Sequence, residues 1–228
     1  MMYAFLRVIM RTLTRGFLFG GLFRIEGIEN VPVNGPLIVC SNHTGTIDPP
    51  LVPAFLPRSD TWSMAKSEFF RKRWMRWLFG AYHAFPVVRH TADRAALRRS
   101  LELLEDGQCL VIFPEGTRVE SGVLAEPEPG AGFIAQRCGC PVAPVALTGT
   151  RECLPKGKLW PRRVPVTVRF GKPFVVLQRR PTGERVSHEE AAEAIMVAIA
   201  ELLPPEKRGV FNDFEARRSR LAGVTAPA

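Results

Sequence analysis

Apolar residues along the chain follow two patterns. Short continuous runs predict strands at residues 23–28, 36–40, 61–65, 84–89, 109–113, 142–147 and 164–170. Helical spacing, together with start and stop residues, predicts helices at residues 1–23, 49–57, 67–80, 92–105, 132–137 and 187–203. Strands that alternate with helices indicate an α/β fold, a single domain with a largely parallel mixed sheet flanked by helices.

We divide the chain into three parts. Residues 1–24 form an N-terminal amphipathic helix, residues 25–203 form the main domain, and residues 204–228 form a polar, basic tail that we expect to be mobile. The sequence contains no internal repeat and no domain linker, so we expect one core.

Polar residues follow the apolar run 36–40 abruptly, and among them are His43 and, five residues later, Asp48. A loop rich in Gly and Thr can fold back so that the carboxylate meets one imidazole nitrogen. The other nitrogen is then free to act as a general base. The alternative is that Asp48, which precedes Pro49, caps a helix and that His43 is a polar residue at a strand end.

Two more apolar runs end in charged residues. Arg89 closes the run at 84–89, and the run at 109–113 gives way to the polar loop 114–118. The carboxyl ends of parallel strands meet at one edge of a sheet, where ligands bind in such folds. We therefore expect His43, Arg89 and this loop to share one site.

The residue types of the 114–118 loop suit a phosphorylated substrate. Arginine binds phosphate oxygens in a bidentate manner, so Arg118 is a candidate phosphate ligand. Exposed N–H groups around Gly116 and Thr117 would add hydrogen bonds. Glu115 would repel a phosphate, and we expect it to receive a substrate hydroxyl or to orient Arg118.

The charge of the chain implies an anionic partner. Thirty-one Lys and Arg residues against twenty-two Asp and Glu residues give a net charge of +9, and 46% of the residues are hydrophobic. A nucleic acid, an anionic membrane or a phosphorylated substrate would each fit this charge. We expect no nucleic-acid partner, because the aromatic residues lie within apolar runs and no nucleic-acid-binding motif is present.

The cysteine pattern predicts neither a metal site nor a disulfide framework. Five cysteines, an odd number, indicate a reducing compartment. Cys138 and Cys140 lack a second pair at zinc-like spacing, so we interpret all five as structural.

The N-terminal segment carries Arg7, Arg11 and Arg15 on one helical face. Arginines disfavour a membrane-spanning helix, and no apolar region with a cleavage site indicates a secretory signal. We expect a helix that lies in the membrane interface, with its arginines toward the lipid head groups. The residues available to face the acyl chains are Phe5, Leu6, Ile9, Leu13, Phe17 and Leu18. The alternative is an ordinary helix packed on the core. The aromatic and basic residues of 67–80 would also suit a membrane surface.

No Gly-x-Ser-x-Gly elbow occurs, and no cysteine lies in a catalytic context. Without a protein nucleophile, the expected mechanism is direct attack of an acceptor hydroxyl on an activated acyl group. His43 would be the base, and a thioester suits as donor because its thiolate leaves readily.

Asn42-His43-x-x-x-x-Asp48 together with residues 113–118 resembles the glycerolipid acyltransferase superfamily, in particular its 1-acylglycerol-3-phosphate (lysophosphatidate) acyltransferases. Residues 80–89 resemble the second motif of that family, and residues 140–145 resemble its fourth. The motifs occur in the right order over residues 31–171. The resemblance implies that residues 25–203 form an acyltransferase domain.

By that resemblance, His43 is the general base and Asp48 its partner, and the glycerol phosphate is bound by Arg89, Glu115, Gly116, Thr117 and Arg118. It implies acyl-CoA or acyl-carrier protein as donor substrate, lysophosphatidate as acceptor, and no cofactor or metal. It also implies a role in phospholipid biosynthesis at an anionic membrane. We expect a peripheral or monotopic protein on the cytoplasmic face of the cell membrane.

The sequence departs from the family after Arg118. Val119 stands where a polar residue is frequent, and the lysine often found before the next glycine is missing. Another lysolipid, such as a lyso-ornithine lipid or a lysophospholipid, is therefore an alternative acceptor. A second alternative is a basic lipid- or nucleic-acid-binding protein without catalysis.

Overall fold

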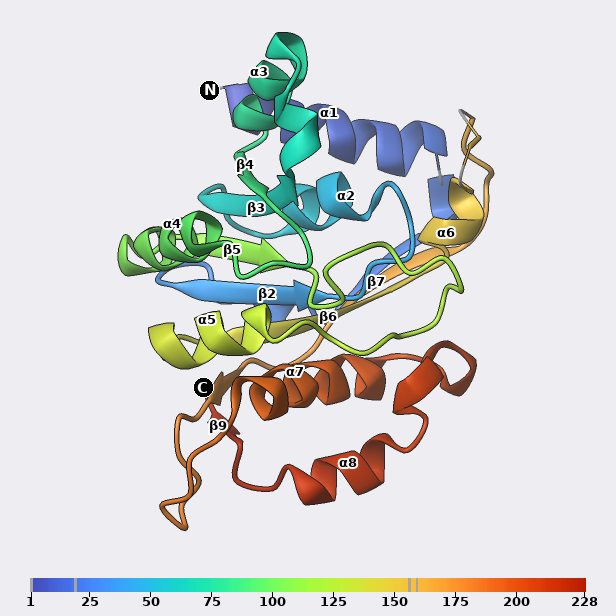
Figure 1. Ribbon diagram of the computed structural model, residues 1–228. Helices are drawn as coiled ribbons and strands as arrows, with labels where there is room; N and C mark the ends of the chain where they lie inside the picture. Colours follow the sequence, from blue (N-terminus) through green and yellow to red (C-terminus); the bar gives the residue numbers. More distant parts are fainter. Residues whose placement is uncertain (1, 19, 156, 159) are drawn as a thin grey trace.

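A mixed, mostly parallel sheet forms the centre of the molecule (Figure 1). The computed structural model describes residues 2–18, 20–155, 157–158 and 160–228. The order of the main strands is β1-β7-β6-β2-β5-β3-β4, and β8 pairs with β6 and β9. The strands are β1 Phe23–Glu26, β2 Leu37–Ser41, β3 Thr61–Lys66, β4 Ala84–Val87, β5 Cys109–Ile112, β6 Val142–Thr148, β7 Val166–Phe170, β8 Phe174–Val176 and β9 Thr225–Pro227. The predicted fold class is confirmed.

Helices cover both faces of this sheet (Figure 1). The α-helices are α1 Met2–Thr12, α2 Asp48–Phe55, α3 Arg73–Ala81, α4 Arg94–Glu105, α5 Gly130–Cys138, α6 Thr150–Cys153, α7 His188–Leu202 and α8 Phe214–Arg220. A π-helical segment, η1 Leu13–Leu18, continues α1. Short 3-10 turns are η2 Gly20–Leu22, η3 Ile28–Asn30, η4 Ser67–Phe70, η5 Pro205–Lys207 and η6 Gly209–Phe211. The helix predicted at 67–80 is thus divided into η4 and α3.

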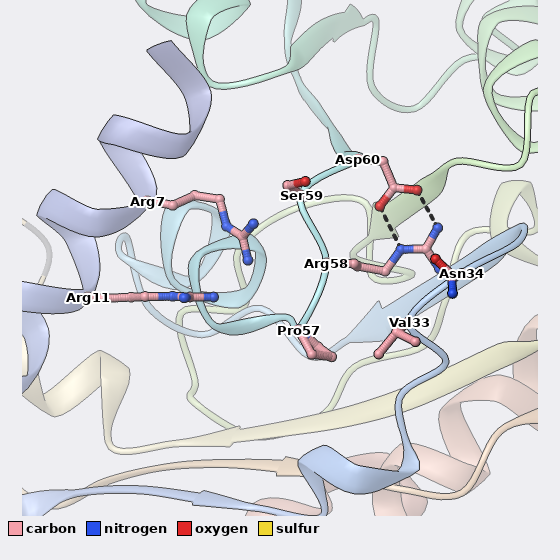
Figure 2. A pocket seen from close by; sticks show the side chains of 8 residues that line it. All are labelled: Arg7, Arg11, Val33, Asn34, Pro57, Arg58, Ser59 and Asp60. Atoms are coloured by element: carbon pink, nitrogen blue, oxygen red, sulfur yellow. Dashed lines mark hydrogen bonds and ion pairs between the residues drawn. The ribbon is translucent and has the colours of Figure 1, made fainter. Parts of the chain in front are cut away.

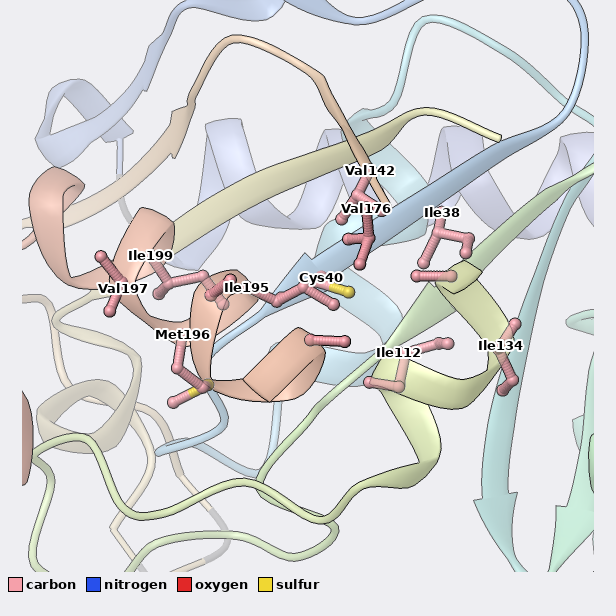
Figure 3. Close-up of a cluster of buried hydrophobic side chains, with 14 of the residues drawn as sticks. Ile38, Cys40, Ile112, Ile134, Val142, Val176, Ile195, Met196, Val197 and Ile199 are labelled. Atoms are coloured by element: carbon pink, nitrogen blue, oxygen red, sulfur yellow. The ribbon is translucent and has the colours of Figure 1, made fainter. Parts of the chain in front are cut away.

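The central strand β2 is buried on both faces and packs into two cores. Ile38 and Cys40 lie in a cluster with residues of α4, α5 and α7 (Figure 3). Leu37 and Val39 point to the opposite cluster, which includes Leu51 of α2. This alternation is the period of a strand, and burial on both faces explains the continuous apolar run.

Ser187 and Glu190 have the Ser-x-x-Glu spacing that predicts a capping box, and this capping box is present at the start of α7. The Ser187 hydroxyl accepts from the backbone N–H of Glu190, and the Glu190 carboxylate accepts from that of Ser187. This reciprocal pair satisfies two N–H groups that the helix leaves without internal partners, and so it fixes where α7 begins.

Two expectations about the rest of the chain are wrong. Residues 205–227 are packed against the domain: β9 pairs with β8, and the side chains of Phe211, Leu221 and Val224 are buried. The apolar residues of this segment are widely spaced among basic residues, so they gave no periodic signal in the sequence.

Cys138 and Cys140 are joined as a disulfide at the end of α5, whereas no pairing was expected.

The arginines of α1 face the protein and not the outside. Arg7 is 7% exposed, and its Nη2 donates to the carbonyl of Leu56, the residue that follows α2. Arg11 donates to the carbonyls of Ala54 and Leu56. Cations are stabilising at a helix C-terminus, which explains this orientation. The prediction that these two arginines face lipid head groups is wrong.

Arg7 and Arg11 border a cavity of about 510 Å³ with Arg58 and Asp60, which are ion-paired (Figure 2). This cavity lies before the first residues of β2 and β3, at the amino edge of the sheet. The apolar side of α1 consequently faces outward: Phe5 is 60% exposed, and Val8 and Ile9 are also exposed. The prediction also named Phe17 and Leu18, whose side chains are not among those that the structure describes.

None of the helices in the described residues is both long and apolar enough to cross a membrane.

Candidate active site

The predicted site residues follow strands that end at the same edge of the sheet. β2, which precedes His43, pairs in parallel with β5, which precedes the 113–118 loop. β3 joins β5 to β4, so Arg89 reaches this edge from two strands further along. The structure therefore gathers His43, Arg89 and Arg118 at one edge, as the apolar runs predict.

His43 and Asp48 form a buried pair. His43 Nδ1 lies 2.9 Å from Asp48 Oδ2, and the Asp48 side chain is 0% exposed. The same oxygen accepts hydrogen bonds from the backbone N–H groups of Thr44 at 2.8 Å and Gly45 at 2.7 Å. Asp48 thus binds the loop that precedes it, and no side chain caps the first turn of α2. Helix capping does not account for Asp48.

Close approach to Thr150 explains why glycine occupies position 45. A Cβ atom at Gly45 would lie 2.7 Å from Thr150 Oγ1 and 2.8 Å from Thr150 Cβ. Any larger residue would push the loop away from Thr150 of α6. The backbone N–H of residue 45, which donates to Asp48, would move with it.

The imidazole is oriented by contacts on one edge and one face. Nδ1 is occupied by Asp48, and the ring lies 4.6 Å from that of Phe113, centroid to centroid. Within the described residues, Nε2 makes no hydrogen bond. This arrangement makes Nε2 the basic nitrogen that can receive a proton.

Glu115 holds the backbone at His43. Its carboxylate accepts from the N–H of His43 at 2.7 Å and from that of Ala125 at 3.2 Å, and the residue is buried. Burial raises the pKa of Glu115 to about 7, although the two N–H groups act in the opposite direction. Val119 also donates its N–H to the carbonyl of His43 at 2.8 Å. The loop at 113–119 therefore clamps His43 on both sides.

Gly116 forms a tight turn in this loop. Its φ is +68°, and its N–H donates to the carbonyl of Phe113 at 3.0 Å. We expected this N–H to be free to bind a phosphate, but it is used within the turn. A Cβ atom here would lie 2.8 Å from Glu128 Cγ. Thr117 lies in the same turn. The turn itself directs Arg118 toward the His43 loop.

Arg118 and Arg89 lie near one another. Arg118 Nη1 donates to the hydroxyl of Thr46, between His43 and Asp48. Burial lowers the pKa of the half-buried Arg89; Glu68 raises it and the positive charge of Arg118 lowers it further. Two arginines that feel each other's charge form a cationic site beside the histidine.

A pocket of about 420 Å³ lies next to the His43 loop. Its lining residues come from that loop, from the segment after Gly116 and from the segment after β6, and they are Thr44, Arg118, Glu120, Arg151, Glu152, Leu154, Pro155, Arg162 and Val164. Sequence reasoning found no specific task for Arg151 and Arg162. The signal that would have found Arg151 is its position just after β6, another strand that is parallel to β2.

Among the described residues, no group of three or more His, Cys, Asp and Glu side chains could hold a metal ion.

Comparison with known proteins gives one consistent result. The profile of the family described as "Acyltransferase" matches residues 22–148. A 1-acyl-sn-glycerol-3-phosphate acyltransferase of Bacillus subtilis is 30% identical over 145 residues, which are 62% of this chain and 71% of that protein. A chloroplastic enzyme of the same name from Brassica napus is 31% identical over 137 residues, which are 58% of this chain. The matched region spans only 39% of the length of that relative.

A solved structure shares the fold. The crystal structure of the 1-acyl-sn-glycerophosphate (LPA) acyltransferase PlsC from Thermotoga maritima superposes with a TM-score of 0.68 at 26% identity. The match covers 86% of this chain and 76% of that one.

Proposed function

The chain belongs to the acyltransferase family, and we propose that it transfers a fatty acyl group from a thioester to the free hydroxyl of lysophosphatidate, giving phosphatidate. The observation that carries this proposal is the 2.9 Å contact between His43 and Asp48 beside Arg118. The relatives named for this reaction support the choice of acceptor. The donor is acyl-CoA or acyl-carrier protein.

In the proposed reaction, the oxygen of the acceptor hydroxyl attacks the thioester carbonyl while His43 Nε2 removes the hydroxyl proton. The tetrahedral intermediate then collapses, the C–S bond breaks, and the proton passes from His43 to the leaving thiolate. Asp48 keeps the Nδ1 proton in place and stabilises the imidazolium without becoming protonated. General base catalysis of this kind contributes about 10²- to 10⁴-fold to the rate.

Arg118 and Arg89 are the proposed ligands of the acceptor phosphate. Arg118 contacts the His43 loop at Thr46, and Arg89 is near enough to Arg118 to feel its charge, so the two could hold a glycerol phosphate whose free hydroxyl faces Nε2. Glu115 has a different role in this proposal. Because its oxygens accept from two backbone N–H groups, it positions His43 instead of binding substrate.

We also propose that the protein binds an anionic membrane surface peripherally, on the cytoplasmic face. Tyr3 of α1 stacks on His83 and contacts Tyr82, so α1 and the end of α3 lie together (Figure 1). Exposed apolar side chains lie on α1, on α3 and on the η4 turn that precedes α3, and they are Phe5, Val8, Ile9, Phe69, Trp74, Trp77 and Leu78. Exposed basic residues, Arg71, Lys72, Arg73 and Arg76, lie between them. This mixture suits an interfacial helix.

The test of catalysis is acyl transfer from a long-chain thioester to lysophosphatidate in detergent. We expect activity in the wild type and its loss in His43→Ala. His188→Asn, which changes a histidine that contacts Gln136 and Phe133, should remain active. A fully active His43→Ala enzyme would exclude the base. Transfer to another lysolipid alone would keep the mechanism and replace the acceptor.

The test of membrane binding is sedimentation with vesicles that contain anionic phospholipid. The double variant Phe5→Ser/Trp77→Ser should have a vesicle partition coefficient at least tenfold lower than that of the wild type. The reason is that burying each of these side chains is worth about 1.5 to 3 kcal/mol. Leu22→Ser, a change of an exposed apolar residue outside α1, η4 and α3, should bind as the wild type does. Equal binding by both variants would refute the proposal.

A further inference from the structure

The pocket beside Thr44 contains two arginines that no predicted role uses. Arg151 is the second residue of α6, which follows β6, and Arg162 lies in the segment that leads to β7. Both line the pocket with Arg118, and the backbone N–H of Arg162 donates to the carbonyl of Cys153 at 2.7 Å. The segment that carries Arg162 is thus joined to the end of α6.

Arg151 is held in position by the loop opposite. Its Nη1 donates to the carbonyl of Ser121 at 2.9 Å. Its side chain lies over Gly122, where a Cβ atom would be 2.7 Å from Nη1 and 2.8 Å from Cδ. In the described part of the chain this is the one hydrogen bond of that guanidinium, so other N–H donors remain for a ligand.

Cations outweigh anions around this pocket. Of its two carboxylates, Glu152 is paired with Lys207 at 2.9 Å, and Glu120 lies exposed. Leu154, Pro155 and Val164 add an apolar wall. A pocket with arginines and an apolar wall suits a phosphate joined to a long, weakly polar arm.

The reaction proposed above requires two phosphate-bearing substrates at one histidine. The acceptor carries a phosphate on glycerol, and the donor carries one on the pantetheine arm that ends in the thioester. The strand order places β6 and β7 on one side of β2, and β5, β3 and β4 on the other. Arg151 and Arg162 therefore approach His43 from the side opposite Arg89, with Arg118 between them.

We propose that Arg151 and Arg162 form a second phosphate subsite, which holds the phosphate of the donor's pantetheine arm. The inference rests on the proposed function and assigns the acceptor phosphate to the side of Arg89. Both acyl-CoA and acyl-carrier protein present this phosphate, so the subsite would serve either donor.

The test compares two donors that differ only in this group, S-acyl-4′-phosphopantetheine and S-acyl-pantetheine. In the double variant Arg151→Ala/Arg162→Ala, we expect KM for the phosphorylated donor to rise about 10- to 100-fold, the range for losing charged hydrogen bonds. The kcat/KM for the unphosphorylated donor and the KM for lysophosphatidate should stay within about twofold. Arg163→Ala, at a neighbouring exposed arginine, is the matched control and should behave as the wild type.

Two outcomes would overturn the subsite. One is an equal loss with both donors, and the other is a raised KM for lysophosphatidate alone, which would place the acceptor phosphate in this pocket. Calorimetric binding of CoA separates this proposal from the reaction itself. If no acyl transfer occurs, weaker CoA binding by the double variant still supports the subsite, and unchanged binding refutes it. Equal melting temperatures verify that the variants are folded.

Discussion

Two groups of arginines lie at opposite edges of the same sheet. At the amino edge, Arg7 and Arg11 line a cavity (Figure 2) and donate to the carbonyls of Ala54 and Leu56 at the end of α2. At the carboxyl edge, Arg118 and Arg151 each make one side-chain hydrogen bond within the described residues, and both line the pocket beside Thr44.

The difference lies in what each edge offers a guanidinium group. A helix C-terminus presents carbonyls without partners, and arginines that satisfy them stabilise the fold. At the edge where β2 and β5 end, loop carbonyls such as those of His43 and Phe113 already accept from backbone N–H groups, so the arginines there keep donors for a ligand. We therefore expect changes at the amino edge to alter stability and changes at the carboxyl edge to alter activity.

The largest expected effect is at Asp48. Asp48→Asn should lower kcat by roughly 10³- to 10⁴-fold, because an amide neither fixes the correct tautomer nor stabilises the imidazolium. Steady-state kinetics at saturating substrate measure this loss. The matched control is Asp60→Asn at the amino edge, which breaks an ion pair with Arg58. It should lower the melting temperature and leave kcat unchanged; a similar loss of kcat in both variants would break the comparison.

Arg118→Ala should raise the KM for lysophosphatidate about 10- to 100-fold, because one charged hydrogen bond to phosphate is worth about 1.5 to 3 kcal/mol. Its melting temperature should change little, since Arg118 makes only one recorded side-chain contact in the described residues. A variant that keeps its KM but melts early would assign Arg118 to the structural group.

Arg11→Ala should act in the opposite way. The Ala54 carbonyl loses its side-chain donor and the Leu56 carbonyl keeps only that of Arg7, which costs about 1 to 2 kcal/mol of unfolding free energy and roughly 2 to 8 °C in melting temperature. The kcat and both KM values should be unchanged. Arg24→Ala, at an exposed arginine of β1, controls for the loss of charge. Lost activity at an unchanged melting temperature would contradict the structural role.

The smallest effect concerns Glu115, which lies at the carboxyl edge and whose hydrogen bonds in the described residues come from backbone N–H groups. Its pKa is raised from 4.5 to about 7 by burial, so the folded state binds more protons than the unfolded state between these values. Stability should therefore fall as pH rises from about 4.5 to about 7. Glu115→Gln should flatten this dependence in melting curves taken between pH 5 and 8. A wild-type stability that rises through this window would refute the assignment.

Much of the fold followed from local patterns. The apolar runs predicted seven strands close to their observed bounds, because a strand buried on both faces needs continuous apolar residues. The pairing of His43 with Asp48 also followed, since five residues of loop are short enough to bring the side chains together. The capping box of α7 needed only two residues of the sequence.

Other features depended on partners far along the chain. The spacing of Arg7 and Arg11 placed them on one face of α1, but only the position of α2 turned that face inward. The Glu115 carboxylate accepts from the N–H groups of His43 and Ala125, and only the fold brings His43 to it. The segment after residue 204 packed because β8 offered its edge to β9.

The sequence alone determined which residues meet at the proposed site, because local spacing brings His43 to Asp48 and strand ends bring arginines to the edge of a sheet. Only the tertiary structure decided which arginines serve the fold and which face a pocket. The physical reason is that a guanidinium group binds whatever acceptors the folded chain places around it, and those acceptors lie tens of residues away in sequence.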